Sequence, residues 1–71
     1  MMLIVERWEK QKVEGPEGIE EAEVIVEERI VASEDEARSV AGEFKENPST
    51  VRVTLHYCRH DEGKPCERVE I

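Results

Sequence analysis

The sequence predicts an α+β fold of order ββαββ, a four-stranded, mostly antiparallel sheet with one helix packed on one face. Three observations lead to this prediction. One stretch has the spacing and capping signals of an amphipathic helix, two β-like stretches joined by a glycine-proline turn precede it, and two joined by a polar loop follow it. A chain of 71 residues is expected to form one domain, residues 1–71, whose core is only just large enough to offset chain entropy.

The helix is predicted to run from Ser33 to about Glu46. Its apolar residues recur at i, i+3, i+4 and i+7, which places them along one stripe: Ala37, Val40, Ala41 and Phe44. Ser33 and Glu36 form a capping box, in which the Ser33 hydroxyl accepts from the Glu36 amide and the Glu36 carboxylate accepts from the Ser33 amide. Pro48 cannot continue the helix. The stripe therefore needs a sheet to pack against.

Residues 2–13 and 19–32 are predicted to be the two strands of one hairpin. The turn between them is Gly15–Gly18, where proline fixes φ and glycine accepts positive φ. The second strand alternates well between apolar and polar residues until Glu28, which interrupts the apolar face. We therefore expect a kink near that residue.

Alternation in the first strand is imperfect. Leu3 and Val5 lie on one face, whereas Ile4 and Trp8 lie on the other. Either both faces are partly covered or a bulge near Glu6 resets the pattern. Trp8 is expected to pack at the edge of the core, with an exposed contact role as the alternative.

Residues 50–57 alternate more cleanly than any other stretch, and 66–71 follow as a short last strand after the polar loop. If these two segments pair as a hairpin, one register matches their apolar faces. It places Cys58 opposite Cys66, Leu55 opposite Val69 and Val53 opposite Ile71. A slip of one residue would mismatch both faces.

These assignments divide the side chains between two faces of the sheet. The predicted core comprises Leu3, Val5, Val24, Val26, Ile30, Val40, Phe44, Val51, Val53, Leu55, Tyr57 and Val69. The opposite face is predicted to carry Ile25, Val31, Arg52, His56, Cys58, Cys66 and Arg68. Uncovered sheet faces and edges are common sites of partner binding.

The chain is strongly acidic. Eighteen acidic and ten basic residues give a formal charge of −8, and charged residues make up 39% of the chain. Residues 14–28 contain no lysine or arginine but seven glutamates: Glu14, Glu17, Glu20, Glu21, Glu23, Glu27 and Glu28. Such a surface repels nucleic acid and attracts basic partners, although it also simply keeps a small protein dissolved.

Composition also bears on location. No apolar run reaches the roughly 18 residues that a membrane span needs, and Met1–Val5 lacks the basic lead and cleavage site of a signal peptide. We therefore expect a cytoplasmic protein. Asn47 and Gln11 are the only side-chain amides, a bias typical of thermophile proteins.

All the thiols and imidazoles of the chain, His56, Cys58, His60 and Cys66, lie within eleven residues. Three interpretations remain open. Cys58 and Cys66 could form a cross-strand disulfide, since directly opposed residues have a suitable spacing. The two cysteines with one or both histidines could instead bind zinc, although the spacing lacks the paired knuckles of common zinc modules. Finally, all four could be ordinary reduced or surface side chains.

The sequence thus predicts a small acidic protein-interaction module without catalytic activity, since so short a chain has little room for a pocket. Its partner is expected to be a protein, with a basic surface favoured by charge, or a second copy bound through the open sheet face or edge. A narrower form is a phage or mobile-element inhibitor that acts as a DNA-mimicking decoy. The alternative is a zinc-binding or redox-responsive domain centred on Cys58 and Cys66. Net charge opposes nucleic-acid binding through Arg52, Arg59 and Arg68.

Overall fold

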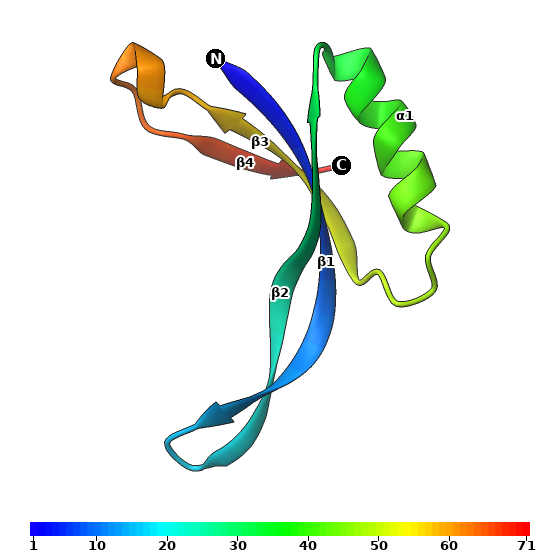
Figure 1. The fold of residues 1–71 in the computed structure, drawn as a ribbon, viewed down its shortest axis with the longest axis vertical. Helices are drawn as coiled ribbons and strands as arrows, with labels where there is room; N and C mark the ends of the chain where they lie inside the picture. The colour runs from blue at the N-terminus through cyan, green and yellow to red at the C-terminus, as the bar shows by residue number, and fades with distance from the viewer.

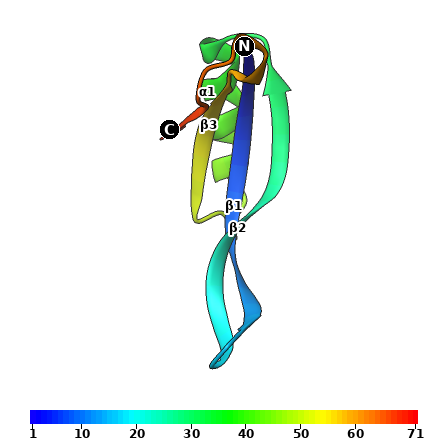
Figure 2. The same ribbon diagram turned by 90° about the vertical axis from the view of Figure 1, so that its left-hand side faces the viewer.

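The computed structural model describes residues 1–71 and has the predicted α+β architecture. The elements in chain order are β1 (Met2–Gly15), β2 (Gly18–Val31), α1 (Glu34–Lys45), β3 (Arg52–Cys58), the single-turn 3-10 helix η1 (His60–Glu62) and β4 (Glu67–Glu70). The four strands form one antiparallel sheet in the order β2-β1-β3-β4. Helix α1 packs on one face of this sheet, as Figures 1 and 2 show from two directions.

Helix α1 begins and ends close to where the sequence predicts. The Ser33 hydroxyl accepts from the Glu36 amide at 3.1 Å, but the Glu36 carboxylate accepts from the Ala32 amide at 2.9 Å. The Glu36 carboxylate was predicted to accept from the Ser33 amide, but its donor is the amide one residue earlier in the chain. All four residues of the predicted apolar stripe are buried, including Phe44 at 4% exposure.

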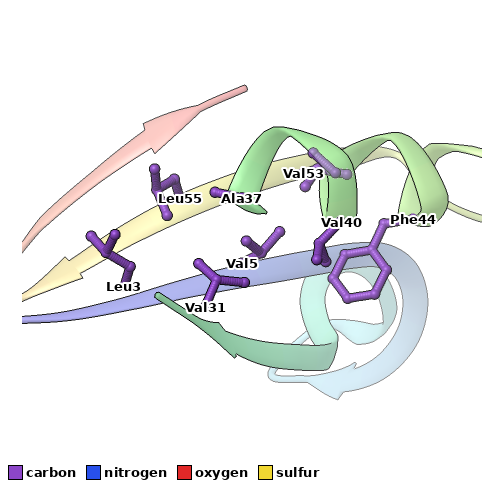
Figure 3. Packing of buried hydrophobic residues seen from close by; sticks show 9 residues of the cluster. Leu3, Val5, Val31, Ala37, Val40, Phe44, Val53 and Leu55 are labelled. Atoms are coloured by element: carbon purple, nitrogen blue, oxygen red, sulfur yellow. The ribbon is translucent and has the colours of Figure 1, made fainter. Parts of the chain in front are cut away.

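The core lies between α1 and the sheet (Figure 3). It consists of Leu3, Val5, Val31, Ala37, Val40, Ala41, Phe44, Val53 and Leu55. Tyr57 and Ile71 are partly buried against it. Only 12 of the 71 residues are buried, and nine of them are these apolar core residues.

The predicted core is wrong at several positions in the outer strands and at the residue before β3. Ile30, Val51 and Val69 are exposed, and Val24 and Val26 are only half-buried. Val31, which the sequence pattern assigns to the open face, is instead in the core at 7% exposure.

A bulge in β2 explains the exchange of Ile30 and Val31. Arg7 pairs with Glu27 whereas Trp8 pairs with Ile25, so Val26 is an extra residue in the ladder. An extra residue reverses the alternation beyond it. The irregularity is therefore real but lies in β2 opposite Arg7 and Trp8, close to the predicted bulge and kink positions.

The β1–β2 hairpin is longer than the rest of the sheet. Pairing between β1 and β3 ends at Trp8 and Arg52, while β1 and β2 remain paired to Gly15 and Gly18. Figure 1 shows this part of the hairpin projecting away from α1, β3 and β4 as a two-stranded ribbon. We call residues 9–24 the arm, and none of them is buried.

None of the helices has both the length and the apolar character that a membrane span requires.

Candidate functional site

The sheet face opposite α1, here called the open face, carries the even-numbered residues of β1 and β3. Cross-strand pairing aligns Met2 with Cys58, Ile4 with His56, Glu6 with Thr54 and Trp8 with Arg52. On β4, Arg68 lies opposite His56. The open face therefore gathers polar, thiol and imidazole side chains, whereas the alternate residues of the same strands form the core.

Glu6 is the centre of a polar network on the open face. Glu6 is 2% exposed, and its carboxylate accepts hydrogen bonds from Arg68 Nε at 2.7 Å, Arg68 Nη2 at 3.0 Å and Thr54 Oγ1 at 2.8 Å. The Nδ1 atom of His56 lies 3.5 Å from Glu6 Oε2. Burial alone would raise the pKa of Glu6, but the hydrogen bonds from Arg68 and Thr54 outweigh it and lower the pKa. Glu6 is therefore an ionised, fully engaged acceptor.

Trp8 lies at the lower end of this network rather than at the edge of the core. Its Nε1 donates to Thr54 Oγ1 at 2.8 Å. The guanidinium carbons of Arg52 and Arg68 lie 4.4 Å and 5.8 Å from the centre of its ring, within reach of cation–π attraction. Trp8 is half-buried, so its ring and the two arginines form a partly exposed platform.

His56, Cys58 and Cys66 come together at the other end of the open face. One donor atom from each residue can be chosen so that all lie within 4.8 Å of one another, and all three residues are half-buried. The β3–β4 pairing confirms the predicted register at Leu55 and Val69, and its continuation places Cys66 opposite Cys58. Both cysteines are free thiols in the structure. His60 is exposed in η1 and is not part of this group.

A hollow of about 280 Å³ opens beside Cys58. Its lining consists of Met1, Met2, Cys58, His60 and Asp61. The N-terminal ammonium lies 3.1 Å from Asp61 Oδ2 and 3.4 Å from Glu62 Oε2, and these contacts tie the β3–β4 loop to the start of β1. Cys58, which is half-buried, therefore borders this hollow.

The predicted acidic residues are spread along the outer hairpin rather than gathered at one point. Glu27 accepts from Arg7 Nε at 2.9 Å. Glu23 Oε1 lies 3.1 Å from Arg52 Nε, in a direction that does not make a hydrogen bond. In the β1–β2 register, lysines lie directly opposite Glu21 and Glu23. By contrast, Glu14, Glu17 and Glu20 are exposed, and no ion pair involves them.

The sequence analysis does not identify Glu6 and Thr54 as functional residues. Glu6 lies between Val5 and Arg7 in a strand whose pattern is already irregular, so nothing local marks it as buried. The available signal is its even spacing with Ile4 and Trp8, which places all three on one face. Knowing that β1 pairs with β3 is what brings Glu6 next to Thr54, His56 and Arg68.

Comparisons with protein-family models, curated proteins and solved structures found no match. The chemistry of these residues is therefore argued from their geometry alone.

Proposed function

We propose that the protein is a small, non-catalytic interaction module that binds a basic protein partner through its arm. The observation that supports this most strongly is that the arm extends beyond β3 without a buried residue. A two-stranded ribbon with no core of its own is marginally stable in water. A partner that covers it would supply the missing burial.

Charge favours a basic partner. The arm contains six acidic residues and two lysines, which is half of the formal charge of −8. The lysines, Lys10 and Lys12, lie opposite Glu23 and Glu21. The glutamates near the turn, Glu14, Glu17 and Glu20, have no lysine opposite them. Oppositely charged surfaces accelerate encounter and set orientation. The tip of the arm is therefore the proposed point of first contact.

The narrower form of this proposal is a decoy that occupies the nucleic-acid groove of its partner. The extended, acidic shape of the arm supports it, because successive carboxylates along a ribbon can replace successive phosphates. The two lysines divide the carboxylates into a tip group and a group near the sheet. Competition between the protein and DNA for a basic groove would distinguish this form from binding to another basic surface.

The proposal is tested with a lysine- and arginine-rich peptide as the probe, titrated against the protein at low and high salt. The variant Glu14→Gln/Glu17→Gln/Glu20→Gln is compared with Glu46→Gln/Glu67→Gln/Glu70→Gln, which removes the same charge elsewhere. We expect weaker binding and a smaller salt dependence in the arm variant only. Equal losses in the two variants, or binding that 0.5 M salt leaves unchanged, would contradict the proposal.

Self-association is the competing outcome, because the outer edge of β2 is unpaired over its length. Sedimentation velocity across a range of protein concentrations separates the two. A protein that stays monomeric at all concentrations agrees with a different, basic protein as the partner. A stable dimer whose formation requires the β2 edge would instead show that the partner is a second copy of the chain.

A further inference from the structure

A group of one imidazole and two thiols lies at the opposite end of the molecule from the tip of the arm. We propose that His56, Cys58 and Cys66 bind one zinc ion and that Glu6 holds the His56 ring in position for it. This inference does not depend on the arm or on its partner.

The donor atoms have the right types and nearly the right spacing. Two thiolates and an imidazole suit zinc, which binds sulfur at about 2.3 Å and nitrogen at about 2.0–2.1 Å. A tetrahedral ion with such bonds spaces its donors roughly 3.5 to 3.8 Å apart. The three donors here lie within 4.8 Å of one another, so each pair has to approach by at most about 1.3 Å. Small side-chain rotations would be enough.

The backbone already places these donors before any ion binds. His56 and Cys58 alternate along β3 and therefore project from the same face of the sheet. Cys66 precedes β4 directly and follows Pro65, whose ring limits the backbone at this point. Tyr57 of β3 pairs with Glu67 of β4, and each is next to one of the cysteines in the sequence. This pairing therefore fixes the backbone on both sides of the site. Metal binding consequently requires little ordering of the chain.

Glu6 acts as the positioning residue for His56. Zinc-binding histidines commonly donate a hydrogen bond from their second ring nitrogen to a carboxylate, which fixes the ring orientation and its tautomer. The His56 Nδ1 atom lies 3.5 Å from Glu6 Oε2, and the proposal assigns the other ring nitrogen, Nε2, to the ion. Glu6 is itself held by Arg68 and Thr54. The carboxylate therefore has a fixed place from which to orient the ring.

Charge balance also favours the site. Binding converts two thiols to thiolates, whose protons pass to solvent, so that the ion with both sulfurs is neutral. Arg68 lies opposite His56, and its positive charge would disfavour a cation if it were unpaired. Its guanidinium is already bonded to Glu6. The hollow borders Cys58, so it leaves room beside this one donor for a water as the fourth ligand.

The experiment measures zinc bound per chain, by native mass spectrometry and metal analysis, in protein reduced, stripped with a chelator and titrated with zinc. Variants Cys58→Ser, Cys66→Ser and His56→Gln each remove one donor. The matched control is His60→Gln, which removes an exposed imidazole two residues from Cys58. We expect one zinc per chain in the wild type and in His60→Gln, and loss of stoichiometric binding in the other three.

Two further measurements keep the test valid if a variant fails to fold. Zinc should protect both thiols of the wild-type protein from alkylation, and cobalt in its place should give the absorption of a tetrahedral thiolate complex. Glu6→Gln should retain the site but weaken zinc binding by about 10- to 100-fold. A change of that kind, with stoichiometry preserved, identifies a positioning role.

The proposal is overturned by any of three results. The first is a wild-type protein that takes up no zinc while both thiols are reduced. The second is an intact mass lower by two hydrogen atoms that reductant restores and zinc cannot prevent, which would indicate a disulfide between Cys58 and Cys66. The third is loss of zinc binding in His60→Gln, which would place the ion elsewhere.

Discussion

The two faces of strand β1 carry opposite kinds of side chain. Leu3 and Val5 point toward α1 and belong to the buried apolar core. Glu6 and Trp8, one residue out of phase, point the other way into a network of hydrogen bonds and guanidinium contacts. A single strand thus supplies both the apolar core and the polar site.

The comparison shows how a very small protein separates stability from chemistry. The helix-covered face holds nine apolar core residues, whereas the buried residues of the open face are Glu6 and Thr54. Apolar burial is non-directional and stabilises the fold as a whole. A buried polar network instead fixes particular atoms at particular distances. The effects of substitutions on the two faces should therefore differ in their physical cause as well as in their size.

The largest loss of stability is expected on the helix-covered face, from Phe44→Ala. Phe44 is 4% exposed and packs between α1 and the sheet, so its truncation leaves a cavity. Such changes cost about 3–5 kcal/mol. Urea denaturation followed by circular dichroism measures this, and a cost below about 1 kcal/mol would mean that α1 contributes little to the core.

A smaller loss is expected on the open face, from Glu6→Gln. The variant keeps the size of the side chain but removes the charge that Arg68 and Thr54 bond to. Hydrogen bonds to charged groups contribute about 1.5–3 kcal/mol, and the lower end applies because the Arg68 side chain is 43% exposed to water. Glu28→Gln, an exposed position directly across the strand pair from Glu6, is the matched control. Equal effects in the two variants would contradict a special role for Glu6.

The same residue predicts a pH dependence. The pKa of Glu6 is lowered in the folded protein, so its contribution to stability is complete above the ordinary value of 4.5 and is lost as pH falls through the lower folded value. Metal-free protein should therefore lose stability in acid, and Glu6→Gln should lose less over the same range. Parallel curves for the two proteins, in denaturation midpoints between neutral and acidic pH, would contradict the prediction.

The smallest effect on stability is expected in the arm. Glu14→Gln/Glu17→Gln/Glu20→Gln changes exposed side chains that form no ion pair, so the denaturation midpoint should not fall. Removing close negative charges could even raise it slightly. Circular dichroism in urea provides the measurement, and a clear loss of stability would show that these arm residues contribute to the fold.

The fold was largely predictable from the sequence because its signals are local. The capped stripe of α1, the glycine-proline turn and the β3–β4 register each depend on residues close together in the chain, and each is confirmed. The phase of β2 was not predictable, because one extra residue at Val26 exchanges the faces of Ile30 and Val31. Alternation alone cannot place a bulge of this kind.

The candidate site was predictable only in part, for a related reason. His56, Cys58 and Cys66 lie on one hairpin, so pattern and register bring them together. Sequence proximity also suggests His60 as a member, but η1 places it outside the group. Glu6 is 50 residues from His56, and their contact depends on β1 pairing with β3. Strand order of this kind is a property of the whole fold.

The separation of the two faces is tested most directly by the shift in melting temperature that zinc causes. We predict that zinc raises the melting temperature of the wild type. Val40→Ala, on the helix-covered face, should melt lower without metal yet keep the same zinc-dependent shift. Cys66→Ser should melt like the metal-free wild type and lose the shift. A Val40→Ala protein that no longer responds to zinc while still folded, or a Cys66→Ser protein that still responds fully, would contradict the separation.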